Sequence, residues 1–292
     1  MKISAILAQK RTLSFEFFPP PGRSGIPGVF ETMRRLRAYG PDFVSVTHSP
    51  DARRRPLSEE VASRAETATG ATVMAHLTCI GRTRDQVATV LEELEASGVK
   101  NVLALRGDAP RNDPDFDEAN GEFESAIDLV EFIKRQFAMC VAVACYPEGH
   151  PDDADLQSDV EHAKRKQDAG ADLFISQLFF DNSDFFGFLD RARQVRIQIP
   201  VIPGLLPIIG ARQVRRFTHM TGSRIPAALD RKIAEHEGDD GAVAELGVEH
   251  TTGQLSELLE SGIPGVHFYA LNRTHSVSRV LQNVGIVPQV IP

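Results

Sequence analysis

One acidic residue interrupts an apolar segment near the start of the chain. Glu16 lies in SFEFFPP, flanked by Phe15, Phe17 and Phe18. A carboxyl group buried in such a segment loses its hydration, which favours the protonated form and suits a proton donor near neutral pH. An ion pair with a buried arginine is the alternative role. We favour proton donation and take Glu16 as the first candidate catalytic residue.

Polar residues also accompany the other short apolar segments. They are Thr47 and His48 after FVSV, His76 and Thr78 within VMAHLTC, Arg106, Gly107 and Asp108 after NVLAL, Tyr146, Glu148 and His150 after VAVAC, Gln177 and Asp181 around ISQLFF, and Asn272 and Arg273 after VHFYAL. In a parallel barrel the active site lies at the carboxyl ends of the strands. If these segments are strands, the polar residues converge on one site.

Three of the polar segments have both a binding and a structural interpretation. In LRGD, backbone N–H groups near Gly107 can approach an anion or a polar ring, whereas Asp108 is also a common turn-capping residue. The run KRK at 164–166 is typical of a solvated helix face, but near a site it can bind a diphosphate. Gln177 needs a partner, since an unpaired buried amide costs about 1–3 kcal/mol, and a ligand can supply it.

The elements that must position these residues alternate along the chain. About eight apolar segments have the composition of strands, and segments such as 83–97 and 126–137 between them have helical spacing. Thr83 and Gln86 have the spacing of a capping box, and Gly40, Gly98, Gly170 and Gly262 stand where helices should end. Such alternation requires a parallel sheet.

The length and the repeat together predict one architecture. With 292 residues and no Gly-rich first turn, we predict an α/β fold, a (β/α)8 TIM barrel, over a single catalytic domain of residues 1–292. The long stretch from Arg224 to Ser261 is predicted to be an additional helical insertion, with two helices, between strands 7 and 8.

Composition and motifs exclude several classes of protein. The net charge of −8 disfavours nucleic acid as a partner. No segment has the length and hydrophobicity of a membrane span, and the N-terminus lacks a signal-peptide pattern, so we expect a cytoplasmic enzyme. The dinucleotide, P-loop and zinc-protease motifs are absent, and no metal site is expected. Cys79, Cys140 and Cys145 are expected to be core residues.

Several segments together closely resemble the methylenetetrahydrofolate reductase family. They are SFEFFPP, FVSVT, HLTC, NVLALRGD, YPEGHP, KRKQDAGAD, ISQLFFD, IPGLLP and HFYALNR, in the family's order over nearly the whole chain. The resemblance implies a flavoprotein of folate one-carbon metabolism and methionine biosynthesis. NADH or NADPH would reduce FAD, leave, and be replaced by 5,10-methylenetetrahydrofolate, which is reduced to 5-methyltetrahydrofolate. A homo-oligomer is left open.

The same resemblance implies roles for individual residues. Glu16 matches the acid that assists protonation at nitrogen 10 of the folate, and Asp108 matches the aspartate between flavin and pterin. The positions that match contacts to the folate or the nicotinamide are Gln177, Phe217, Arg273 and Thr47. The positions assigned to FAD are His48, His76, Arg106, Gly107, Asp108, Ala126, Tyr146, His150, Asp159, Arg165 and Lys166.

The chain departs from the family pattern on the flavin side. His48 and Pro50 replace a Tyr-Gly-Ala run of small residues, Ser125 replaces an aromatic residue, and His162 replaces a common asparagine. Proline removes an N–H and fixes φ, so this loop cannot bind flavin in the usual way. Two alternatives therefore stay open: a flavin-independent reductase that passes hydride directly from the nicotinamide to the folate or a related pterin, and a non-catalytic folate-binding barrel.

Overall fold

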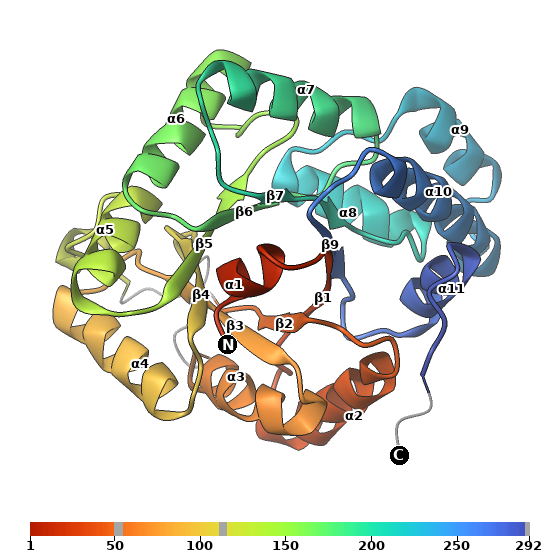
Figure 1. The fold of residues 1–292 in the computed structure, drawn as a ribbon. Helices are drawn as coiled ribbons and strands as arrows, with labels where there is room; N and C mark the ends of the chain where they lie inside the picture. The colour runs from red at the N-terminus through yellow and green to blue at the C-terminus, as the bar shows by residue number, and fades with distance from the viewer. Residues whose placement is uncertain (50–54, 111–115, 290–292) are drawn as a thin grey trace.

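Parallel strands form a ring at the centre of the molecule, and helices surround it (Figure 1). The computed structural model describes residues 1–49, 55–110 and 116–289. The strands are β1 (Thr12–Phe17), β2 (Phe43–Val46), β3 (Thr72–Thr78), β4 (Asn101–Leu105), β5 (Cys140–Cys145), β6 (Leu173–Ser176), β7 (Val201–Ile202), β8 (Gly204–Leu205) and β9 (Gly265–Tyr269). Their order in the sheet is β7-β6-β5-β4-β3-β2-β1-β9-β8.

The helices follow the strands in alternation, as the sequence predicts. They are α1 (Ile3–Leu7), α2 (Ile26–Arg37), α3 (Arg55–Thr69), α4 (Arg84–Ala96), α5 (Ala126–Gln136), α6 (Leu156–Asp168), α7 (Asn182–Gln194), α8 (Ala211–Thr221), α9 (Ala227–Glu235), α10 (Asp240–Glu260) and α11 (His275–Asn283), with short 3-10 turns at Arg23–Gly25 and Glu118–Asn120. None of these described helices has the length and apolar character needed to cross a membrane.

The predicted seventh strand is divided at Pro203. Its first part, β7, pairs with β6, and its second part, β8, pairs with β9. Pro203 has no N–H to donate, but its carbonyl accepts a hydrogen bond from the His267 N–H at 2.9 Å. The chain therefore changes partners at the proline and brings the two ends of the sheet together. The prediction of a (β/α)8 barrel is confirmed. Its seventh strand consists of two short strands, β7 and β8.

The predicted starts and ends of helices are also confirmed. Thr83 and Gln86 form a complete capping box at the start of α4. The glycine that follows α4, Gly98, has φ +90°, and Gly170 after α6 has φ +111°. Both adopt a left-handed conformation that ends the helix and turns the chain toward the next strand.

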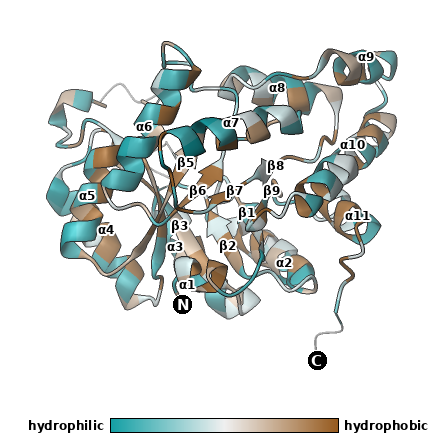
Figure 2. Ribbon diagram, turned by 45° about the horizontal axis from the view of Figure 1, so that its top comes forward, coloured by the Kyte–Doolittle hydropathy of each residue, from teal (hydrophilic) through white to brown (hydrophobic). Residues whose placement is uncertain are grey.

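Two apolar layers hold the barrel together. Outside it, strand residues such as Phe15 and Phe17 pack with Phe30 and Met33 of α2. Inside its amino-terminal half, a separate cluster contains Phe43 and other strand residues together with Ile3 of α1. In Figure 2 the strands are largely brown and the surrounding helices carry teal surfaces, as expected for a buried sheet.

Helix α1 closes the amino-terminal end of the barrel. The Ile3 N–H donates to the Asn101 Oδ1 at 2.7 Å, and the Asn101 side chain donates to the carbonyls of Met1 and Val73 at 3.0 Å each. Figure 1 shows α1 across the middle of the ring. Because this end is filled, a ligand has access to the barrel interior from the carboxyl ends of the strands.

The predicted insertion forms two helices, α9 and α10, that extend the α8 side of the barrel (Figure 1). Helix α10 comes close to the loop after β8 at Gly247, where a Cβ would overlap the carbonyl oxygen of Ile208. Gly253, in the same helix, has open space around it. The same residue type therefore has a packing function at position 247 and none at position 253.

These two glycines give a matched test of the insertion. We expect Gly247→Ala to destabilise the protein by about 1–3 kcal/mol, because the added methyl forces α10 away from Ile208. We expect Gly253→Ala to stabilise it by up to about 1 kcal/mol, since alanine is the better helix former. Urea unfolding of both variants measures the difference, and equal effects would contradict the close contact at Gly247.

Candidate active site

Glu16 points into the barrel and is 5% exposed. In the parallel register it lies opposite Ser45 of β2 and Tyr269 of β9. Strand alternation places Phe15 and Phe17 on the helix side of β1, in the outer layer. The prediction of burial is confirmed, but the rings of the sequence neighbours Phe15 and Phe17 do not surround the carboxyl group. Because neighbouring residues along a strand face opposite sides of the sheet, the side chains around the Glu16 carboxyl group come from other strands.

Two imidazoles lie next to the Glu16 carboxyl group. Its Oε2 is 3.3 Å from the Nε2 of His76 and 3.6 Å from the Nε2 of His267. Burial lowers the pKa of His76 to about 4, and the nearby Glu16 charge offsets only part of this effect. His76 is therefore neutral at pH 7. Its Nε2 is buried and makes no hydrogen bond among the described residues.

Tyr269 forms another side of the Glu16 environment. Its hydroxyl donates to the Ser176 carbonyl at 2.7 Å, which links β9 to β6. Burial, and then the Glu16 charge, raises the pKa of Tyr269 far above its usual value. The phenol is therefore neutral and fixed. Neither Tyr269 nor His267 is among the residues predicted from the sequence, although their spacing of two in VHFYAL places both on the same face of a strand.

A second group of predicted residues comes together between β5 and α6. The rings of Tyr146 and His150 are in edge contact at 4.5 Å between centroids, and the Lys166 ammonium lies 5.7 Å from the Tyr146 ring centre. The His150 N–H donates to the Asp159 Oδ1 at 3.3 Å, and the Lys166 Nζ donates to the Ala144 carbonyl at 3.0 Å. Four residues predicted to bind flavin therefore share one partly buried site.

The charges in this second group are incompletely paired. Burial raises the pKa of Asp159 to about 6, and its Oδ2 finds no hydrogen-bond partner in the described part of the chain. Burial also lowers the pKa of Lys166. His162 departs from the family pattern, and its pKa is lowered to about 4 by burial and by the charges of Lys166 and Arg165. The Arg165 side chain itself is exposed. A buried ammonium next to an unpaired carboxylate oxygen can bind a polar ligand.

The predicted residues at the ends of β2 and β3 are engaged with protein groups. The His48 Nδ1 lies 2.8 Å from the Thr78 Oγ1, and the Arg82 Nη2 lies 3.3 Å from the His48 Nε2. Burial lowers the pKa of His48. Pro50 lies outside the described residues. At the end of β2, His48 is therefore a buried imidazole whose two ring nitrogens both have neighbouring protein groups.

The end of β4 is more open than the other strand ends. Asp108 is exposed, and Gly107 has φ +83°, where a Cβ would also meet the Thr78 side chain. Arg106 is paired with Glu118 and donates to the Glu124 carbonyl at 3.2 Å. The structure therefore directs the Arg106 guanidinium toward its own loop.

Ser125, another departure, has a local structural explanation. Its hydroxyl caps α5 by accepting the Asp128 N–H, and the Asp128 carboxylate accepts the Ser125 N–H at 2.9 Å. An aromatic residue cannot cap the helix in this way. Ala126, predicted to contact flavin, is the first residue of α5 and is half-buried.

The predicted substrate residues lie on four elements around the barrel mouth. Thr47 is half-buried at the end of β2, Phe217 is half-buried on α8, and Arg273 is exposed after β9. The Gln177 Oε1 accepts the Leu178 N–H at 2.9 Å, while its NH2 group has no partner within the described ranges. A small pocket is lined by Tyr269 and Arg273 together.

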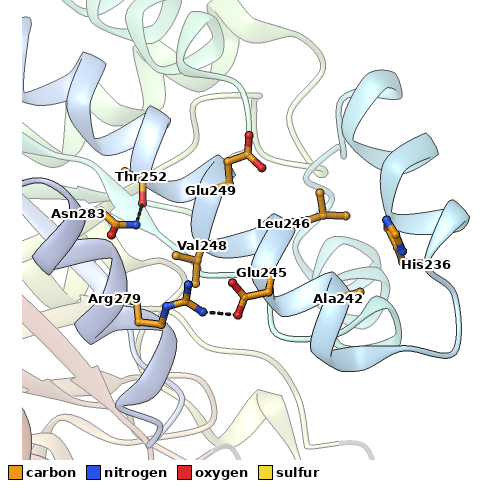
Figure 3. A pocket seen from close by; sticks show the side chains of 9 residues that line it. All are labelled: His236, Ala242, Glu245, Leu246, Val248, Glu249, Thr252, Arg279 and Asn283. Carbon is orange, nitrogen blue, oxygen red and sulfur yellow. Dashed lines mark hydrogen bonds and ion pairs between the residues drawn. The ribbon is translucent and has the colours of Figure 1, made fainter.

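A surface hollow lies away from this site. It has a volume of about 660 Å³ and is lined by residues of α10 and α11, with His236 at one side (Figure 3). Its lining includes the Arg279–Glu245 ion pair and the Asn283–Thr252 hydrogen bond. None of the predicted site residues takes part, so size alone does not identify the active site. Among the described residues no group of three His, Cys, Asp or Glu is placed to hold a metal.

Comparison with known proteins decides the family. The family model described as methylenetetrahydrofolate reductase matches residues 2–285. The chain belongs to the methylenetetrahydrofolate reductase family. A relative from Arabidopsis thaliana, methylenetetrahydrofolate reductase (NADH) 1, is 36% identical over 99% of this chain and 51% of its own length. The 5,10-methylenetetrahydrofolate reductase of Salmonella typhimurium is 33% identical over 94% of this chain and 91% of its own length.

Solved structures share the fold of this methylenetetrahydrofolate reductase family member. A Clostridium thermocellum protein, described as binding two copies of 5-methyl-5,6,7,8-tetrahydrofolic acid, matches with a TM-score of 0.65 and 14% identity over 95% of each chain. Dihydropteroate synthase from Xanthomonas albilineans matches with a TM-score of 0.53 and 13% identity over 97% of this chain and 94% of its own. The chain spans about half the length of the plant relatives.

The raised pKa of Asp159 gives a pH-dependent prediction. Because its folded-state value of about 6 exceeds the usual 3.8, ionisation of Asp159 costs stability at higher pH. We expect Asp159→Asn, which keeps an oxygen for the His150 N–H, to be more stable than wild type by about 1–3 kcal/mol at pH 7.5. The gain should vanish below about pH 4, where Asp159 is protonated in both states.

Urea unfolding at both pH values measures this effect, with Asp181→Asn as the control. Hydrogen bonds to Ser183 lower the pKa of Asp181, so its carboxylate stabilises the folded state above its usual pKa. The control variant should therefore lose stability at pH 7.5, in the opposite direction. A gain in Asp159→Asn that is the same at both pH values would contradict the proposed cost of burial.

Proposed function

We propose that this chain reduces 5,10-methylenetetrahydrofolate to 5-methyltetrahydrofolate with electrons from a reduced nicotinamide nucleotide, with FAD bound in the barrel mouth. The observation that carries the proposal is a buried carboxyl group, Glu16, held inside the barrel of a methylenetetrahydrofolate reductase family member. The folate named for the Clostridium thermocellum structure supports the same substrate class. The plant relatives are named for NADH, which makes NADH the first reductant to test and NADPH the second.

Glu16 is the proton donor in this proposal. Methylenetetrahydrofolate holds its one-carbon unit in a five-membered ring, and protonation at nitrogen 10 breaks the ring bond to give a reactive iminium. An acid for this step must be protonated near pH 7 and close to the substrate. Glu16 is buried inside the barrel, and its neighbours His76 and Tyr269 are both uncharged at pH 7.

The groups proposed to hold the substrate surround the barrel mouth. The NH2 of Gln177 is directed to the pterin, Phe217 packs on the ring of either ligand, and Arg273 pairs with the carboxylate tail of the folate. Asp108, exposed at the end of β4, accepts hydrogen bonds from the pterin. Thr47 adds a hydroxyl at the end of β2. This set combines an amide, a ring and charges that suit a polar heterocycle with an anionic tail.

The residues between β5 and α6 fit the polar part of FAD. Lys166 is buried and its ammonium has one protein acceptor, the Ala144 carbonyl, while the Asp159 Oδ2 is unpaired in the described structure. A diphosphate can accept from the ammonium, and a ribose hydroxyl can donate to the carboxylate. Arg165 adds a positive charge nearby, and Tyr146 and His150 provide flat surfaces. When bound, the flavin supplies a carrier of hydride between the nicotinamide and the folate.

The remaining residues proposed to contact FAD are His76, Arg106, Gly107, Ala126 and His48. The Nε2 of His76, which makes no hydrogen bond within the described residues, supports its assignment. Arg106 and His48 are engaged with protein groups, so they have to exchange partners for a ligand. The buried imidazole of His48 is the observation that favours the second candidate, a reductase in which hydride passes directly from the nicotinamide to the folate.

Replacing the proton donor separates the two halves of the reaction. We expect Glu16→Gln to lower the rate of folate reduction by about 10²–10⁴-fold, because the amide has no acidic proton to give. Oxidation of NADH with an artificial quinone acceptor, which needs no protonation at nitrogen 10, should stay near the wild-type rate. Stopped-flow absorbance measures both. Equal loss of the two reactions would contradict the role assigned to Glu16.

A matched pair on α6 tests the FAD site. We expect purified protein to show a flavin absorption band, and Lys166→Met to weaken FAD binding by about 10-fold or more, because a charge-assisted hydrogen bond is lost. Lys164→Met removes the partner of Asp168 on the same helix and should leave FAD affinity unchanged. Fluorescence titration with FAD measures both. Protein that reduces the folate without binding FAD would establish the direct-transfer alternative.

A further inference from the structure

His267 is a fully buried polar side chain next to the proposed proton donor. It lies on β9, is 0% exposed, and stacks on the Phe43 ring at 5.9 Å between centroids and an interplanar angle of 13°. Its Nδ1 is 2.8 Å from the Ser14 Oγ, and its Nε2 is 3.4 Å from the Ser45 Oγ and 3.6 Å from the Glu16 Oε2. Both ring nitrogens therefore have defined neighbours.

The contacts of Ser14 indicate which nitrogen carries the proton. The Ser14 hydroxyl donates to the Val266 carbonyl at 3.1 Å. A hydroxyl has one hydrogen, so with that hydrogen on the carbonyl the oxygen can only accept from the Nδ1–H of His267. Both contacts are satisfied together in this arrangement. The Nε2 of the neutral ring then presents a lone pair toward Glu16 and Ser45.

The other titratable groups around this pair are neutral at pH 7. His76 faces Glu16 from β3, with a pKa near 4, and Tyr269 faces it from β9, with a pKa raised by burial. His48, which follows β2, acts on His76 from further away and has a pKa lowered by burial. The Glu16 Oε2 therefore faces two imidazole nitrogens, the Nε2 of neutral His76 at 3.3 Å and the Nε2 of His267 at 3.6 Å. Of these two rings, His267 is the one whose tautomer is defined by the contacts of Ser14.

We infer that His267 is a positioning residue that keeps Glu16 in its acid form, because Ser14 fixes the ring with its lone pair toward the carboxyl group. This inference rests on the proposed function. A lone pair accepts the carboxylic O–H and repels a carboxylate. When Glu16 protonates nitrogen 10, its O–H bond breaks and an N–H bond forms on the folate. A proton from solvent then returns to the carboxylate, and His267 takes no part in the proton transfer.

Two serines that contact the same ring provide the test. Ser14→Ala removes the acceptor of Nδ1–H and lets the ring place an N–H toward Glu16, which favours the carboxylate. The basic limb of the pH profile for folate reduction should then shift to lower pH by about one unit. Ser45→Ala also removes a buried hydroxyl from the ring, but leaves the Nδ1–H anchored, so its basic limb should stay at the wild-type pH. When Ser14→Ala is added to the Glu16→Gln variant, the pH profile of the residual folate reduction should not shift further.

The outcomes separate the inference from the proposed function. Wild-type protein that reduces no folate with either nicotinamide at any pH overturns the function and the inference together. Active wild type with the same shift in both serine variants, or with none, overturns the inference alone. If Ser14→Ala does not fold, ¹⁵N NMR of histidine-labelled wild type decides. A proton on Nδ1 of neutral His267 supports the inference, and a proton on Nε2 overturns it.

Discussion

The burial of one carboxyl group inside a ring of parallel strands is the constraint on which the rest of the structure depends. An acid in this position needs polar neighbours, and a single strand cannot supply them, because residues adjacent to Glu16 along β1 face the helices. The neighbours come from β9, which pairs with β1, and from β3, which lies beyond β2 on the other side of β1. The closed barrel is what brings them together, and the apolar plug formed by α1 and the strand cluster around Phe43 closes the opposite end.

Much of this architecture follows from the sequence. Apolar segments of strand length, the capping box at Thr83 and glycines such as Gly98 mark the repeating units, since each feature depends only on local chemistry. The burial of Glu16 follows from the same pattern. The surroundings of Glu16 do not, because which side chains share the barrel interior depends on the register between strands. His267 and Tyr269 are therefore recognised only once β9 is paired with β1.

Long-range contacts also explain the other differences. Pro203 divides the seventh strand because its two halves have different partners, and no local pattern predicts an exchange of partners. The sequence predicts that Arg106 contacts a ligand, but in the structure its guanidinium pairs with Glu118, twelve residues later. Ser125 departs from the family pattern and is explained by helix capping. Lys166, by contrast, lies in a basic run that is typical of a solvated helix face, but in the structure it is buried beside Tyr146.

The division at Pro203 affects how the barrel wall is built between β6 and β9. Strands β7 and β8 have two residues each, so this stretch of wall has few backbone ladder bonds. Gly204 leaves room here for the Tyr269 ring, whose hydroxyl binds the Ser176 carbonyl across the gap. Ser176 immediately precedes Gln177. This hydrogen bond therefore braces a section of the wall that has short strands, and it ties the Tyr269 side chain to the residue that precedes the Gln177 amide.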